Sequence, residues 1–142
     1  MRAVLDPNVL VSAAISASGA PAQVVRRWLE GEFELVASPL LLEELSRVLA
    51  YPKIAERVSA DDAAALFELV ATEAEVAADG DGPAAVAVED PGDEYLVVLA
   101  VTAGAALVSG DKHLTALADR LPIYRPAEFL QLLDDARDSR LR

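Results

Sequence analysis

Short apolar runs alternate along the chain with longer segments in which apolar residues recur at helical spacing. This alternation is typical of βαβ units and a parallel sheet. The apolar runs predict strands at residues 2–5, 34–37, 75–77, 106–109 and 122–124. The longer segments predict helices at residues 8–15, 21–30, 39–50, 59–73, 92–103, 112–118 and 127–138. The pattern therefore predicts an α/β fold.

A single domain accounts for this pattern. The chain has 142 residues, of which 54% are hydrophobic, so it can bury a substantial core and is not expected to be disordered. The polar, glycine-containing stretch at residues 78–83 is too short for a linker and predicts a loop. Residues 137–142 predict a polar C-terminal tail. We expect one domain at residues 1–136, followed by that tail.

Two scarce residue types exclude several kinds of site. The sequence has no cysteine and one histidine, His113, which excludes disulfides, zinc–thiolate centres, cysteine nucleophiles and histidine-rich metal sites. No apolar run approaches the roughly 18 residues of a membrane helix. The N-terminus lacks the pattern of a signal peptide. We therefore expect a cytoplasmic protein that makes no membrane contact.

The net charge is −12 and it is unevenly placed. Between Val58 and Asp111 there are 12 acidic residues and no Lys or Arg, so the rest of the chain is balanced. A general nucleic-acid binder supplies its phosphate contacts from Lys and Arg and is basic as a whole. Any action of this chain on nucleic acid therefore requires bound metal, a local basic patch or a partner.

Acidic residues gather where predicted strands end and the next helices begin: Asp6, Asp90, Asp93 and Asp111. Because the carboxyl ends of parallel strands line one edge of a sheet, these side chains are expected to meet in one crevice. The helix at residues 39–50 adds a fifth acid. At about 100° per residue, its apolar stripe centres on Leu45, with Glu44 at the edge and Glu43 opposite the core. We therefore favour Glu44 over Glu43.

Helix capping is the alternative explanation of these aspartates. Asp is a favoured N-cap, and Asp-Pro is a common helix entry, so each aspartate alone is explained in this way. The group is harder to explain, because two carboxylates about 5 Å apart repel by about 3 kcal/mol at an effective dielectric constant of about 20. Several such pairs call for a cation, and carboxylate oxygens without His or Cys indicate Mg²⁺ or Mn²⁺.

Four segments, in order along the chain, resemble motifs of the PIN-domain family. They are residues 4–13 (VLDPNVLVSA), 38–49 (SPLLLEELSRVL), 90–96 (DPGDEYL) and 107–114 (LVSGDKHL). The corresponding family motifs are LDTNVLVSA, S-x-x-L-x-x-E-L-x-x-V-L, D-P-D-D-x-x-L and LVTGDxxL. Residues 123–132 fit the family's closing strand and helix. The resemblance covers nearly the whole chain and extends to the VapC-like toxin ribonucleases of type II toxin–antitoxin systems.

The resemblance implies a three-layer α/β/α sandwich with a mainly parallel sheet of about five strands. It also implies a metal-dependent endoribonuclease. The catalytic acids that it implies, and the residues that support them, are Asp6, Glu44, Asp93 and Asp111, with Asn8, Asp90 and Ser109. Mg²⁺, or Mn²⁺, is expected between Asp6, Asp93 and Asp111. Glu44 either holds a second ion or orients the attacking water.

The expected partners follow from the same resemblance: an RNA substrate, a cognate antitoxin and a second copy of the chain in a homodimer. Five basic residues of the early helices either contact RNA or form an ordinary solvated face: Arg26, Arg27, Arg47, Lys53 and Arg57. Trp28 is expected in the core rather than in a dimer contact. His113 is expected to be a surface or RNA-contacting residue rather than a general base.

Other functions compete with this one. A phospho-receiver module is excluded because paired acids after the first strand, an Asp after the third and a Lys near the fifth are missing. A catalytically idle PIN-like binding module stays open, because Pro7 stands where the family usually has Thr and a hydroxyl near the site is lost. A metal-dependent DNA nuclease or phosphatase also stays open, since carboxylate-bound metal serves phosphoryl transfer generally.

Overall fold

A computed structural model describes residues 1–81, 83–84 and 86–141 of the chain. These residues form five strands: β1 (Arg2–Leu5), β2 (Glu34–Ala37), β3 (Glu75–Val76), β4 (Ala106–Val108) and β5 (Ile123–Tyr124). Every pairing is parallel, and the strand order is β3-β2-β1-β4-β5. The predicted parallel sheet is confirmed.

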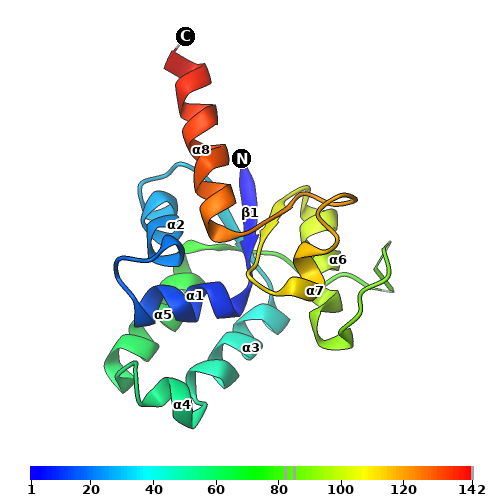
Figure 1. Ribbon diagram of the computed structural model, residues 1–142. Helices are drawn as coiled ribbons and strands as arrows, with labels where there is room; N and C mark the ends of the chain where they lie inside the picture. The colour runs from blue at the N-terminus through cyan, green and yellow to red at the C-terminus, as the bar shows by residue number, and fades with distance from the viewer. Residues whose placement is uncertain (82, 85, 142) are drawn as a thin grey trace.

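Helices cover both faces of this sheet, which confirms the predicted three-layer architecture (Figure 1). The helices in the described residues are α1 (Pro7–Ile15), α2 (Ala20–Leu29), α3 (Pro39–Leu49), α4 (Pro52–Ala55), α5 (Ala60–Glu73), α6 (Glu94–Ala103), α7 (Lys112–Thr115) and α8 (Pro126–Leu141). A 3₁₀ turn, η1 (Pro91–Asp93), precedes α6. Helices α1, α2, α3 and α5 lie on one side of the strands and α6 lies on the other.

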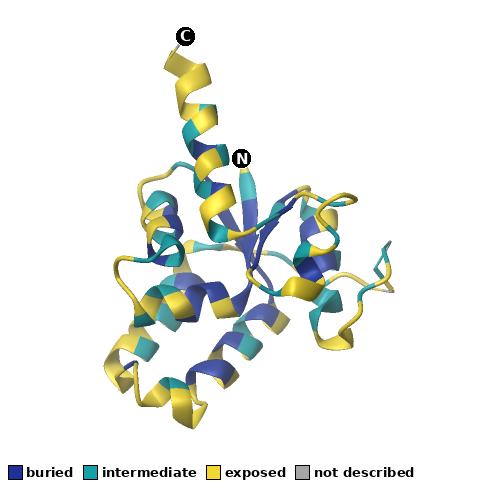
Figure 2. Cartoon of the chain, viewed as in Figure 1, coloured by how far each residue is buried: buried dark blue, intermediate teal, exposed yellow. Residues whose placement is uncertain are grey.

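The core lies between the sheet and these helices (Figure 2). Three consecutive residues of β1, from Ala3 to Leu5, are fully buried, as a central parallel strand requires. Phe129 of α8 is fully buried and meets Phe33 edge to face, with ring centroids 5.1 Å apart. Trp28 is 7% exposed and belongs to the same core, which confirms its predicted position.

Some helices differ in length from the prediction. Helix α7 ends at Thr115, three residues early. Helix α8 continues to Leu141, past its predicted end at residue 138 and through residues where a polar tail was expected. Within this helix, Arg137 pairs with Glu32 near the end of α2 at 2.8 Å. The four-residue α4 was not predicted because it is too short to show a period. Residues 78–81 and 83 form the expected loop, while residues 82 and 142 lie outside the described part of the chain.

No single helix among the described residues is long and apolar enough to cross a membrane. Helices α1 and α2 together have the length and apolar composition of a membrane span, but their axes are bent by 102° relative to one another. The buried residues of both helices pack into the core of the domain.

The position of β1 in the sheet creates the place for a site. β1 pairs with β2 on one side and with β4 on the other, so the strand order reverses around it. Crevices for ligands form at such a reversal, outside the carboxyl ends of the strands. Asp6 follows β1 and Ser109 follows β4 at this edge, where the Asp6 amide donates to the Val108 carbonyl at 3.0 Å.

Candidate active site

Asp6 is the most buried acid of the site, at 3% exposure. Its Oδ1 accepts a hydrogen bond from the Asn8 main-chain amide at 3.0 Å, which caps α1. Its Oδ2 accepts from the Ser109 hydroxyl at 2.8 Å. Burial raises the pKa of Asp6, the two hydrogen bonds oppose that shift, and the charges of Glu44 and Asp111 raise the pKa further. Asp6 is thus held rigidly among like charges.

The Ser109 side chain links Asp6, which follows β1, to Asp111, which comes after β4. It is fully buried, and its Oγ also accepts from the Asp111 amide at 3.0 Å. Asp111 Oδ1 in turn accepts from the His113 amide at 2.8 Å and caps α7. The hydroxyl that contacts Asp6 therefore comes from Ser109. Pro7 occupies a buried first position of α1, where its fixed φ suits the helix start.

Asp93 stands at the end of η1, immediately before α6. Its side chain does not cap α6, and its Oδ2 is buried with no hydrogen-bond partner among the described residues. Burial is the main cause that raises the pKa of Asp93 to about 7, and the charges of Asp111, Asp6, Asp90 and Glu44 add to it, in that order. A buried carboxylate oxygen without a donor is costly unless something else binds it.

Glu44 approaches the same place from α3. It is half-buried, whereas its neighbour Glu43 is exposed, as the helical periodicity predicts. Glu44 Oε2 accepts a hydrogen bond from the Tyr95 hydroxyl of α6. Its charge acts on both Asp6 and Asp93. We call Asp6, Glu44, Asp93 and Asp111 the acidic cluster.

Capping explains part of this arrangement and leaves part unexplained. Asp6, Asp90 and Asp111 each accept a main-chain amide at the start of a helix or 3₁₀ turn, through one carboxylate oxygen. Asp93 and Glu44 cap nothing. Asp90 lies beside the cluster, and its charge acts on Asp93. Capping alone therefore does not account for the cluster.

The remaining predicted supporting residue, Asn8, acts through its main chain. Its amide donates to Asp6, while its side chain is exposed and makes no hydrogen bond among the described residues. Asn8 lines a cleft of about 320 Å³ that opens beside Asp6 and Asp111, together with Ser12 and Gly110. The cleft gives solvent access to the most buried acid of the site.

Two further predictions concern cations and the histidine. Of the five candidate basic residues, Arg27 is engaged with Glu32 and Asp134, and Arg26 donates to the Ala17 carbonyl at 2.9 Å. The other three, Arg47, Lys53 and Arg57, are exposed. His113 is exposed and lies 2.7 Å from Glu89, an interaction that raises its pKa. Within the described part of the chain, no member of the acidic cluster takes part in an ion pair.

The sequence prediction did not include Tyr95 as a site residue. Its hydroxyl contacts Glu44 across 51 positions of sequence, and burial together with that hydrogen bond raises the pKa of Tyr95. The signal available in the sequence was its place two positions after Asp93, at the start of an apolar helix. A phenol there is a hydrogen-bond donor in surroundings that are otherwise rich in acceptors.

The donor chemistry of the cluster fits a hard divalent cation. Carboxylate oxygens are the ligands of Mg²⁺ and Mn²⁺, and the unpartnered Asp93 Oδ2 is available as one. As they stand, no three His, Asp or Glu side chains of the described residues are close enough together to hold a metal ion. The expected ligands Asp6, Asp93 and Asp111 are therefore a convergent group and not a closed cage. Mg²⁺ commonly binds through only one or two carboxylates and keeps several waters, which suits such a group.

Comparison with known proteins identifies the family. The sequence pattern of the PIN domain matches residues 2–113, which include every member of the acidic cluster. The chain belongs to the PIN-domain family. PIN domains are generally nucleases, so this membership assigns the chain to a nuclease family. No curated protein sequence matches the chain significantly.

A solved structure shows the same fold. This PIN domain is similar to a chain in the crystal structure of VapBC2 from Rickettsia felis bound to a DNA fragment from their promoter. The TM-score is 0.59 at 14% sequence identity, and the match covers 88% of this chain and 98% of that chain. At this identity the similarity shows a shared fold.

Proposed function

We propose that this PIN domain is a metal-dependent endoribonuclease that hydrolyses RNA phosphodiester bonds as the toxin of a toxin–antitoxin system. The observation that carries the proposal is Asp93, whose buried Oδ2 lacks a hydrogen-bond partner among the described residues while its pKa is raised to about 7 by burial and nearby acids. Such a group is unfavourable in a purely structural role. It becomes favourable when a cation binds.

Each residue of the cluster has a distinct part in this proposal. Asp6, Asp93 and Asp111 would hold the cation. Ser109 fixes Asp6 and Asp111 relative to one another, because its hydroxyl is hydrogen-bonded to both residues. Bound Mg²⁺ or Mn²⁺ supplies a Lewis acid that activates water and neutralises charge on the phosphate. Glu44 either orients the attacking water or helps to hold a second ion. Water attacks the phosphorus and the P–O3′ bond breaks with O3′ as the leaving group, so the products carry 5′-phosphate and 3′-hydroxyl ends.

The proposed substrate and partners rest on the family and on the structural neighbour. The neighbouring structure is a VapBC2 complex, which supports a cognate antitoxin as partner for this chain. A homodimer is proposed with it, and analytical ultracentrifugation of the chain with and without a co-expressed neighbouring gene product tests both. Because the net charge is −12, the protein as a whole does not attract the negatively charged RNA backbone. Binding of the substrate therefore depends on the metal and on local contacts.

The test is cleavage of a pool of end-labelled structured RNAs with and without Mg²⁺ or Mn²⁺. Asp6→Asn and Asp93→Asn are compared with the wild type, and Asp134→Asn on α8 is the matched control. The proposal predicts metal-dependent cleavage that both cluster variants lose by about 100-fold or more and the control keeps. Cleavage that survives both cluster variants, or products with cyclic phosphate ends, contradicts it. Cleavage of single-stranded DNA of the same sequences instead of RNA assigns a DNA nuclease.

A further inference from the structure

The contact between Tyr95 and Glu44 joins the two sides of the acidic cluster. Tyr95 lies in the first turn of α6, two residues after Asp93, and its hydroxyl donates to Glu44 Oε2 on α3. Both residues are half-buried, and the tyrosine ring packs against the core. The side chain that bonds Glu44 is therefore carried by the same short segment that carries Asp93.

Glu44 needs such a partner to stay in the site. A glutamate side chain has several rotatable bonds, and fixing it costs conformational entropy. Its charge also raises the pKa values of Asp6 and Asp93, so the three carboxylates repel one another. The hydrogen bond from Tyr95 is the interaction shown for the Glu44 carboxylate among the described residues. Loss of this hydrogen bond would remove the interaction that opposes the repulsion from Asp6 and Asp93.

The chemical identity of the donor matters. A Lys or Arg at this place would also hold Glu44, but it would neutralise the carboxylate and compete with a bound cation. A phenol donates a hydrogen bond while it leaves the negative charge of the carboxylate in place. It occupies one lone pair of Oε2 and leaves Oε1 available. Tyr95 thus holds Glu44 without reducing the charge of the cluster.

We infer that Tyr95 is a positioning residue that orients the Glu44 carboxylate within the acidic cluster and fixes it relative to Asp93. This inference rests on the proposed function, because the orientation of Glu44 matters for cation binding and for the attacking water. Tyr95 itself does not contact the reacting atoms in this account. Its effect on the reaction is transmitted through Glu44.

A double-mutant cycle tests the inference. Tyr95→Phe keeps the ring and its packing and removes the hydroxyl, and Glu44→Gln removes the carboxylate charge. Tyr95→Phe should lower kcat for RNA cleavage by about 10- to 100-fold with a smaller change in KM. The double variant should be no slower than Glu44→Gln alone, because Tyr95 acts through Glu44. Losses that multiply in the double variant, or an unchanged kcat in Tyr95→Phe, overturn the inference.

Tyr124→Phe is the matched control. Tyr124 is half-buried and packs near Phe129, with ring centroids 6.2 Å apart, and its hydroxyl makes no hydrogen bond among the described residues. This variant should retain wild-type kcat. A loss equal to that of Tyr95→Phe means that removing any buried phenol weakens the enzyme, and the inference then fails.

A binding measurement separates this inference from the proposed function. We define the Mn²⁺ midpoint as the Mn²⁺ concentration that gives half of the maximal rise in melting temperature. This midpoint should rise about 10-fold or more in Tyr95→Phe and stay unchanged in Tyr124→Phe. If Asp6→Asn abolishes cleavage while Tyr95→Phe changes neither kcat nor the Mn²⁺ midpoint, the inference is wrong and the function stands. If the wild type cleaves no RNA but the Mn²⁺ midpoint still depends on Tyr95, the ribonuclease function is wrong and the positioning of Glu44 stands.

Discussion

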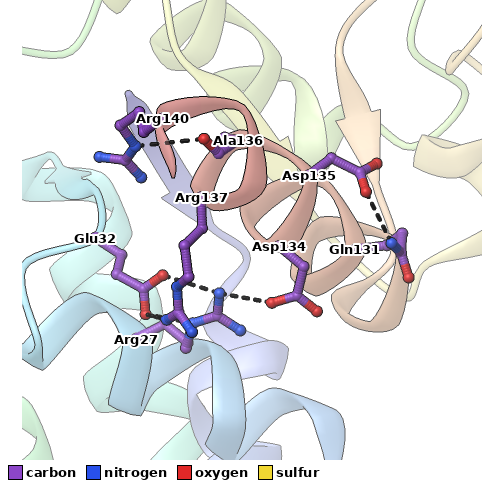
Figure 3. A network of polar contacts seen from close by, with 8 residues as sticks. All are labelled: Arg27, Glu32, Gln131, Asp134, Asp135, Ala136, Arg137 and Arg140. Atoms are coloured by element: carbon purple, nitrogen blue, oxygen red, sulfur yellow. Dashed lines mark hydrogen bonds and ion pairs between the residues drawn. The ribbon is translucent and has the colours of Figure 1, made fainter. Parts of the chain in front are cut away.

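Two groups of carboxylates in this molecule have opposite surroundings. Between α2 and α8, Glu32 and Asp134 are paired with Arg27 and Arg137, which we call the α2–α8 ion-pair network (Figure 3). Hydrogen bonds from the arginines lower the pKa of Glu32. In the acidic cluster, burial and like charges raise the pKa values of Asp6 and Asp93. One chain thus stabilises some carboxylates with cations of its own and leaves others without them.

The difference separates stability from function. The ion-pair network holds the long C-terminal helix against the rest of the domain, and its carboxylates need no bound cation because arginines of the same chain pair with them. The acidic cluster is held in place by hydroxyl and amide donors, from Ser109, Tyr95, Asn8 and His113, that do not cancel its charge. A cluster organised in this way lowers the stability of the metal-free protein, and binding of a cation restores that stability. Four changes test this contrast.

The largest expected effect is a difference between two adjacent glutamates. Glu44→Gln should lower RNA cleavage by about 100-fold, because it removes a carboxylate from the cluster. Glu43→Gln on the same helix should cleave like the wild type, because Glu43 is exposed on the side of α3 that faces away from the core. Rates of cleavage measured under saturating Mg²⁺ compare the two. Equal losses in both variants would mean that α3 contributes through its overall charge and not through a placed carboxylate.

Breaking the α2–α8 ion-pair network should change stability and leave the chemistry intact. Arg27→Met keeps an aliphatic stem but removes the hydrogen bonds to Glu32 and Asp134 at 2.8 Å. The free energy of unfolding should fall by about 1–2 kcal/mol, a value reduced by the solvent exposure of Asp134. Urea unfolding measures this loss, and 1 M NaCl should narrow the difference between variant and wild type. A variant of unchanged stability but reduced cleavage contradicts the contrast.

The metal-free protein should become less stable as the pH rises, because of Asp93. Its folded-state pKa of about 7 lies above the unfolded value of 3.8, so the folded state binds the proton more tightly. The stabilisation by that proton is complete below about pH 4 and is lost as the pH rises through about 7. The melting temperature in EDTA should therefore fall between about pH 5 and pH 8, and Asp93→Asn should flatten the fall. A fall of equal size in the variant assigns the pH dependence to other groups.

The smallest expected effect concerns the exposed pair of Glu89 and His113. The hydrogen bond that the His113 Nδ1–H donates to the Glu89 carboxylate raises the pKa of His113 above 6.5, and the histidine side chain is exposed. In the metal-free protein, Glu89→Gln should move the imidazole pKa back toward 6.5 in an NMR titration. RNA cleavage should change by less than about 3-fold, because neither residue belongs to the acidic cluster. A larger loss would place His113 in the mechanism.

Much of this arrangement could be predicted from the sequence, because it follows from local rules. The period of the apolar residues places β1 and β2 at their observed bounds and distinguishes Glu44 from Glu43. The parallel topology brings Asp6 and Ser109 together although they are 103 positions apart. That contact is predictable because strand ends in a parallel sheet share one edge. The motif order then indicates the family.

The remaining contacts depend on how helices pack, which no local period specifies. Tyr95 meets Glu44 across 51 positions, and Arg27 meets Asp134 across 107. Neither pair is marked by spacing or by composition. The contact of Arg137 with Glu32, which joins α8 to the segment after α2, is of the same kind. The sequence therefore indicates which residues carry chemistry but not which side chains hold them in place.

The measurement that tests the central claim most directly is a calorimetric titration of the metal-free chain with Mn²⁺ at about pH 8. The wild type should bind Mn²⁺ saturably, and Asp6→Asn and Asp93→Asn should each weaken binding by about 10-fold or more. Asp134→Asn, from the α2–α8 ion-pair network, should bind like the wild type. Equal Mn²⁺ binding by all four proteins, or no binding by the wild type, would contradict the claim that the unpaired acids form a cation site.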